Sequence, residues 1–94
     1  MTVWYKQGVL GDLQPVVRKG LGRVAKLFET KDDDLFITSI RDGNHLAGSL
    51  HYDGLAFDME DNPKFQLIEI REALGPDFDV VPEKDHIHCE YDPK

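Results

Sequence analysis

Two of the four histidines of this 94-residue chain, His86 and His88, stand one residue apart near its end. In an extended strand, successive side chains point to opposite faces, so both imidazoles share one face with Glu90. The other face carries Ile87 and Cys89, which we expect to be buried in the core. Imidazole and carboxylate groups are common donors to zinc, yet the same pattern also describes an exposed polar edge strand. Taken alone, this segment leaves both interpretations open.

A second pair of candidate ligands lies upstream, on either side of Gly54. His51 precedes this glycine and Asp58 follows it on an expected strand, so a bend near Gly54 can bring the two side chains back to one point. With one imidazole from the last strand they form a three-ligand set with an open fourth position, which is typical of catalytic zinc. Structural zinc sites instead tend to close with four ligands.

The two segments together resemble the signature of a family of zinc peptidases. The family includes D-Ala-D-Ala carboxypeptidases, vancomycin-resistance D,D-dipeptidases and phage L-alanyl-D-glutamate endopeptidases, and the hedgehog signalling domains are its relatives. Its signature is Ser-x-His-x-x-Gly-x-Ala-x-Asp, followed later by an acid three residues before a final histidine. Residues 49–58 read SLHYDGLAFD, and residues 85–88 read DHIH. The resemblance extends from about residue 35 to residue 91 and implies a hedgehog/D,D-peptidase-like fold.

The resemblance implies a role for each matching residue. The ligands of a Zn²⁺ ion would be His51, Asp58 and His88. Asp85 would be the general base, which takes a proton from water and passes it to the leaving amine. Arg41, which ends a TSIR segment, matches an arginine that polarises the scissile carbonyl. Zinc in such a site lowers the pKa of bound water from about 15.7 toward roughly 7.

Two further residues match positions near the substrate. His86 resembles a histidine that lies beside the last ligand and stabilises the transition state. Ser49 would bond the substrate or the ligand carboxylate, or would serve only as a turn residue. The resemblance therefore implies a zinc-dependent peptidase that acts on peptidoglycan stem peptides or D-Ala-D-Ala-type dipeptides. It would be a D,D-carboxypeptidase or an L-Ala-D-Glu type of endopeptidase.

The spacing of the acids near the last strand allows two registers. Asp85 precedes His88 by three residues, and Glu83 precedes His86 by the same number, so Glu83 is an alternative base. Spacing alone does not choose between them. We favour the first register because hedgehog domains end in a similar His-Ile-His-Cys in which the second histidine is the ligand. In addition, His88, Cys89 and Glu90 match the His-x-Glu that follows the family's motif. Strict alternation then requires Asp85 to lie before the strand, in the preceding turn.

The hedgehog resemblance also supports a function without catalysis. Hedgehog domains signal through other proteins instead of cleaving peptides, so the alternative is a noncatalytic zinc-binding domain that interacts with a protein. Asp85 and Arg41 favour the enzyme, because hedgehog domains carry a non-acidic residue at the position of the base.

The elements that must position these residues follow from periodicity and turn signals. Apolar residues at steps of three and four predict a helix over residues 13–28, and a proline-containing cap at residues 61–63 opens a second helix that ends at Gly75. Strands are predicted over residues 35–39, 55–59, 78–81 and 86–91. This order, α-β-β-α-β-β, is typical of an α+β fold with a small antiparallel sheet and two helices. We expect Trp4 and Tyr5 to pack in the core.

The composition limits the remaining possibilities. The length fits a single domain over residues 1–94. The net charge of -7 argues against a nucleic-acid partner, because such proteins use clustered basic residues to neutralise phosphates. No apolar run is long enough to cross a bilayer, and the first ten residues lack a secretory pattern. We therefore expect a protein that is cytoplasmic as synthesised, with holin-dependent release if it is phage-derived; the oligomeric state is left open.

Overall fold

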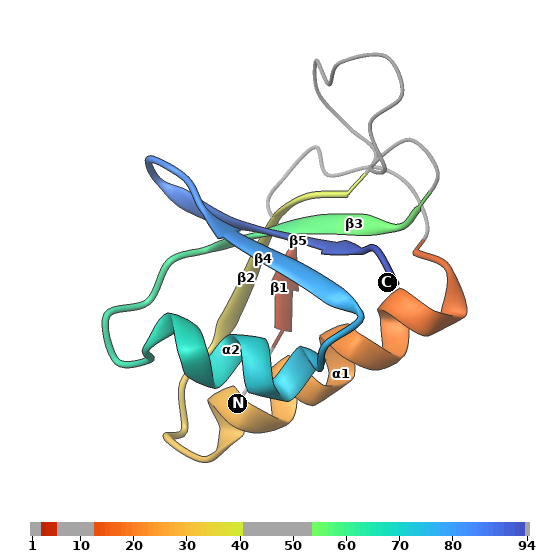
Figure 1. The fold of residues 1–94 in the computed structure, drawn as a ribbon. Coiled ribbons are helices and arrows are strands. Elements are labelled where there is room, and N and C mark those ends of the chain that lie inside the picture. Colours follow the sequence, from red (N-terminus) through yellow and green to blue (C-terminus); the bar gives the residue numbers. More distant parts are fainter. Residues whose placement is uncertain (1–2, 6–12, 41–53, 94) are drawn as a thin grey trace.

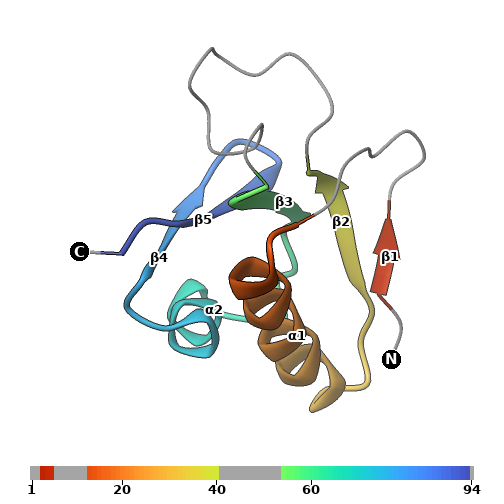
Figure 2. The same cartoon turned by 90° about the vertical axis from the view of Figure 1, so that its right-hand side faces the viewer.

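Two helices and five strands make up the computed structural model, which describes residues 3–5, 13–40 and 54–93 (Figure 1). In chain order they are β1 (Val3–Tyr5), α1 (Pro15–Glu29), β2 (Leu35–Ser39), β3 (Ala56–Glu60), α2 (Leu67–Leu74), β4 (Phe78–Pro82) and β5 (His86–Tyr91). The strands form one sheet in the order β1-β2-β3-β5-β4. Both helices lie on the same side of this sheet, so the protein is a two-layer α+β structure (Figures 1 and 2).

The sheet is mixed and not purely antiparallel, which corrects the prediction. β1 pairs in parallel with β2, whereas the other three pairings are antiparallel. β1 precedes α1, so the predicted order α-β-β-α-β-β describes only the six elements that follow it. The expectation that Trp4 and Tyr5 are core residues is also wrong, because about half of each side chain is exposed, 50% and 53%. The specific likeness to the hedgehog and D,D-peptidase fold stays a prediction.

The core lies between the helices and one face of the sheet. On α1 the buried positions recur at three- and four-residue steps, and they are Val17, Gly20, Leu21, Val24 and Phe28. Apart from Gly20, they belong to one cluster with Phe57 and Met59 of β3 and Ile87 of β5. Each fully buried side chain of this size stabilises the fold by about 1.5–3 kcal/mol. The position of β3 against β5 is therefore held by apolar burial on the helix side.

The second helix begins later than predicted, because the expected cap forms a turn instead. The Asn62 side chain accepts a hydrogen bond from the Lys64 backbone N–H at 2.9 Å, and the Phe65 N–H donates to the Asn62 carbonyl at 3.1 Å. Phe65 then stacks on Phe28 at 4.2 Å between ring centroids, and α2 starts only at Leu67. The predicted end of this helix at Gly75 is confirmed.

Gly75 ends α2 in a conformation that favours glycine. Its φ angle is 93°, and its N–H donates to the Arg71 carbonyl at 2.9 Å. Within the described ranges, neither helix has the length and apolar character needed to cross a membrane.

The two glycines inside α1 differ in their surroundings, which predicts opposite effects of the same substitution. A Cβ on Gly20 would lie 2.8 Å from Phe78 Cζ and 3.0 Å from Leu74 Cδ2, whereas a Cβ on Gly22 would meet nothing within 4 Å. Gly22→Ala should raise the free energy of unfolding by about 1 kcal/mol through helix propensity. In Gly20→Ala, overpacking that costs about 1–3 kcal/mol should outweigh this gain. Urea unfolding measures both, and equal stabilisation by the two variants would contradict the close packing at Gly20.

Candidate functional site

The register of β3 against β5 places the candidate ligands on the sheet face that the helices leave open. Asp58 lies directly opposite His88 in this antiparallel ladder. Because side chains alternate, Ile87 and Cys89 point into the core and are buried, while His88 and Glu90 are only partly buried. The predicted division of the last strand into an apolar and a polar face is confirmed.

A β-bulge in β2 lets the hydroxyl side chains of Thr38 and Ser39 both lie near Asp58. Ile37 pairs with Met59, but Ser39 pairs with Asp58, so β2 has one extra residue at this point. The bulge interrupts the alternation and places Ser39 beside the Asp58 carboxylate. The strand itself matches the predicted range of residues 35–39.

An open hollow of about 330 Å³ lies beside this bulge. It is lined by Thr38, Ser39, Asp58, Asp85 and His86. Five side chains from β2, β3 and the start of β5 thus share one cavity, although they come from three separate parts of the sequence. All five of these described residues are polar, which suits a polar substrate or ion.

His88 is held between two carboxylates. Its Nδ1–H donates to Asp58 Oδ1 at 2.8 Å, and its Nε2–H donates to Glu90 Oε1 at 2.7 Å. The hydrogen bond to Asp58, followed by that to Glu90, raises the pKa of His88 to about 9, against the opposing effect of partial burial. In this arrangement the imidazole carries a proton on both nitrogens at neutral pH.

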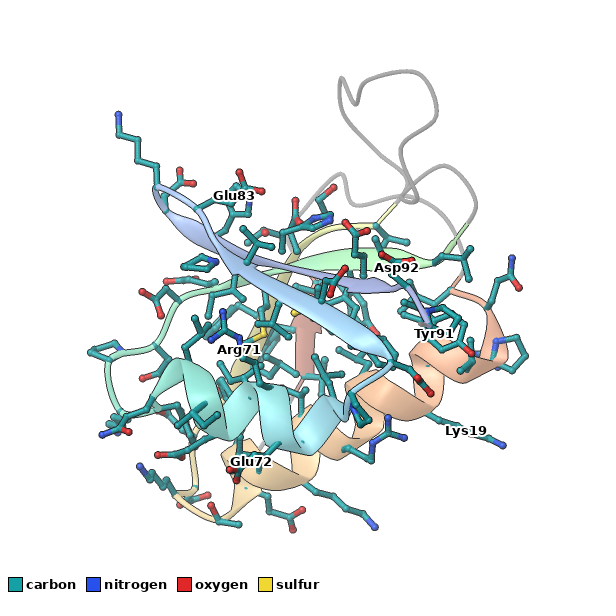
Figure 3. All side chains as sticks on the ribbon, viewed as in Figure 1. Lys19, Arg71, Glu72, Glu83, Tyr91 and Asp92 are labelled. Carbon is teal, nitrogen blue, oxygen red and sulfur yellow. The ribbon has the colours of Figure 1, made fainter. Side chains whose placement is uncertain are left out.

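His86 bridges the acids at the start of the strand. Its Nδ1–H donates to Asp85 Oδ1 at 2.8 Å, and its Nε2 lies 3.6 Å from Asp58 Oδ2 and 3.7 Å from Glu83 Oε1. The contact with His86 lowers the pKa of Asp85, so this exposed carboxyl is ionised at neutral pH. Asp85 lies just before β5, as the favoured register requires. Figure 3 shows Glu83 at the turn between β4 and β5.

The structure thus brings together four of the predicted site residues, namely Asp58, Asp85, His86 and His88. Glu83 lies at the edge of this group, in contact with His86. The predicted ligand His51, the predicted carbonyl-polarising Arg41 and the predicted substrate contact Ser49 lie outside the described residues. Their assignments therefore stay predictions.

The chemistry of the paired donors fits zinc. Asp58 is only 8% exposed, and its Oδ1 faces His88 Nδ1. Two donors bound to a tetrahedral zinc ion at roughly 2.0–2.2 Å lie about 3.3 Å apart. The observed separation of 2.8 Å therefore needs only a small widening, with loss of the proton between the two atoms. These two residues fit as part of the predicted ligand set.

An acidic group beside this site was not predicted. One oxygen each from Asp79, Glu90 and Asp92 lies within 4.8 Å of the others, near the end of β5 that is far from Glu83 (Figure 3). Carboxylates alone suit calcium or magnesium better than zinc. Asp79 lies opposite Glu90 in the β4–β5 ladder, and the two predicted strands did not fix this register.

Comparisons of the chain with protein-family models, with curated proteins and with solved structures give no match. The relation to zinc peptidases is therefore a proposal. It rests on the two sequence motifs and is supported by the contacts around Asp58 and His88.

Cys89 is predicted to be chemically silent in the folded protein. Its side chain is fully buried, and burial raises the pKa of its thiol. We expect no reaction with a disulfide reagent such as DTNB at neutral pH, and one thiol per chain after unfolding in urea. Rapid labelling of one thiol in the native protein would contradict the placement of Cys89 in the core. The unfolded sample serves as the control for reagent and concentration.

Proposed function

We propose that the protein is a zinc-dependent peptidase that hydrolyses peptide bonds of peptidoglycan stem peptides, as a D,D-carboxypeptidase or an L-Ala-D-Glu type of endopeptidase. The observation that carries the proposal is the buried Asp58 carboxylate, whose Oδ1 lies 2.8 Å from His88 Nδ1 beside a hollow that Asp85 and His86 also line. The same four residues occupy matching positions in the two-part motif of the peptidase family. Geometry and motif thus support the same site.

The proposed metal ligands are Asp58, His88 and, from outside the described residues, His51. A bound zinc ion supplies Lewis acidity and lowers the pKa of water toward about 7. The burial of Asp58 contributes to this role, because a carboxylate in a poorly hydrated place gains more from a divalent cation than an exposed one does. Ser39, opposite Asp58 in the ladder, closes the site on the β2 side.

Asp85 and His86 are the proposed proton-transfer groups. Asp85 is ionised, as a proton acceptor must be, and its carboxylate is oriented by the hydrogen bond from His86 Nδ1. Asp85 takes a proton from the attacking water and returns it to the leaving amine. Arg41 polarises the scissile carbonyl, and Ser49 contacts the substrate. His86 faces the hollow and stabilises negative charge that develops on the substrate.

A noncatalytic zinc domain that binds a protein partner is the second candidate. One observation favours this candidate. The Asp85 side chain is 85% exposed, and its carboxylate pairs with the His86 ring and not with Asp58 or His88. Asp85 lines the same hollow as Asp58, but a base that acts on water at the metal also has to direct its carboxylate at that water. The two candidates therefore differ in what Asp85 does once the site is loaded.

Zinc binding is the first test. The wild-type chain should bind zinc in competition with a chromophoric chelator, and Asp58→Asn or His88→Ala should weaken binding at least tenfold, since each removes a ligand. Asp79→Asn should keep the zinc affinity within a few-fold of wild type, because Asp79 belongs to the neighbouring acidic group and not to the ligand set. If Asp79→Asn weakens zinc binding and Asp58→Asn does not, the metal lies in the acidic group instead.

Hydrolysis is the second test, with release of free amines from purified stem-peptide fragments as the readout. Loss of a general base costs about 10²–10⁴ in rate, so Asp85→Ala should lower kcat/KM by that factor and keep zinc. Asp77→Ala is the matched control, because Asp77 is also an exposed aspartate in a turn, after α2. Equal rates for wild type and Asp85→Ala would contradict the assigned base. Zinc binding without any amine release would favour the noncatalytic domain.

A further inference from the structure

We propose that Glu90 is a positioning residue that fixes the orientation of the His88 ring and presents its Nδ1 atom, not Nε2, to the metal. This inference rests on the proposed zinc site and adds a role for Glu90, which matches the His-x-Glu of the resemblance but has no function assigned by it. It concerns how the ligand is held and not which residues are ligands.

The position of the His88 ring supports this assignment. The ring lies between carboxylates from two different strands, Asp58 of β3 across the ladder and Glu90 two residues further along β5. The two contacts are equally short, 2.8 Å at Nδ1 and 2.7 Å at Nε2. The side chains of all three residues are mostly shielded from solvent, with exposed fractions of 11% for Asp58, 17% for His88 and 28% for Glu90.

The two nitrogens of an imidazole point in divergent directions, so only one of them can share an ion with Asp58. That atom is Nδ1, because it faces Asp58 Oδ1. A flip of the ring by half a turn would place the carbon atoms Cδ2 and Cε1 where Nδ1 and Nε2 now face Asp58 and Glu90, so neither carboxylate would keep its nitrogen partner. Glu90 opposes the flip, because its Oε1 accepts the Nε2–H in the present orientation.

The same contact sets the tautomer of the metal-bound state. A metal ligand must be a neutral imidazole with a lone pair on the binding nitrogen, so the remaining proton has to sit on Nε2. Glu90 stabilises a proton at this atom and raises the electron-donating power of the other nitrogen. Outer partners of this kind typically change metal affinity by about 10–100-fold.

A substitution of Asp79 distinguishes the effect of the Glu90–His88 hydrogen bond from the effect of a nearby negative charge. Asp79 lies opposite Glu90 in the β4–β5 ladder and within the same acidic group, whereas the two ring nitrogens of His88 pair with Asp58 and Glu90. Removal of its charge changes the local field and leaves the acceptor of the Nε2–H in place. Asp79→Asn is therefore the matched control for substitutions of Glu90.

The deciding experiment is long-range ¹H–¹⁵N NMR on zinc-loaded wild-type protein, which reads the tautomer of each histidine. We expect His88 to be metal-bound at Nδ1 and protonated at Nε2. Metal binding through Nε2 of His88 would overturn the proposal without touching the zinc site itself. If zinc leaves the His88 signals unchanged, the proposed metal centre fails, and the role of Glu90 in it fails as well.

Substitutions of Glu90 measure how strongly it affects the zinc affinity and the tautomer of His88. Glu90→Leu should weaken zinc binding by about 10–100-fold and abolish the preference of His88 for one tautomer. Glu90→Gln, whose side-chain oxygen still accepts the Nε2–H, should keep both the tautomer and an affinity within a few-fold of wild type, as should Asp79→Asn. An unchanged zinc affinity and tautomer in folded Glu90→Leu would overturn the proposal. If Glu90→Leu does not fold, the tautomer of His88 in the zinc-loaded wild-type protein still tests the proposal.

Discussion

The pairing of β3 with β5 is the constraint on which the rest of the structure depends. It sets Asp58 opposite His88 on the open face, and on the helix face it sets Phe57 and Met59 beside Ile87. Because the side-chain period of a strand is two, a slip of one residue would move Asp58 into the core. Burial of several apolar side chains at about 1.5–3 kcal/mol each opposes that slip. The apolar core thus determines the geometry of the polar site.

The excess of negative charge around the two histidines is the main electrostatic property of the site. Asp58, Asp85 and Glu90 each contact an imidazole at 2.8 Å or less. Without a metal ion, the proton that His88 carries offsets part of this negative charge, which the raised pKa of His88 reflects. A divalent metal ion at Asp58 and His88 would supply the same compensation, so proton and metal compete for one position.

Much of the polar strand could be predicted from local pattern. β5 begins and ends where the alternation of His86 to Tyr91 predicts, and β2 also matches its predicted range. Turn chemistry was harder to predict. The residues around Asn62 have the composition of a helix cap, but the stacking of Phe65 on Phe28 delays the helix. A tertiary contact of this kind leaves no local signal.

The missed features depend on contacts between distant segments. β1 is three residues long and takes its partner from β2, so its alternation is too short to identify, and Trp4 stacks on Phe36 at the surface instead of entering the core. In the site, the motif predicted that Asp58 and His88 meet. It assigned no role to the contact of Glu90 with His88, which follows from the shared face only once the ring orientation is known.

The bulge in β2 separates the requirements of stability from those of recognition. Leu35 and Ile37 keep their places in the core, while the extra residue lets Thr38 and Ser39 both reach the hollow. A regular strand would allow only one of these two neighbours on that side. Substitutions at Thr38 can therefore reshape the rim of the cavity while the packing beneath it stays the same. The shape of this hollow is free to diverge at a position that carries little of the folding energy.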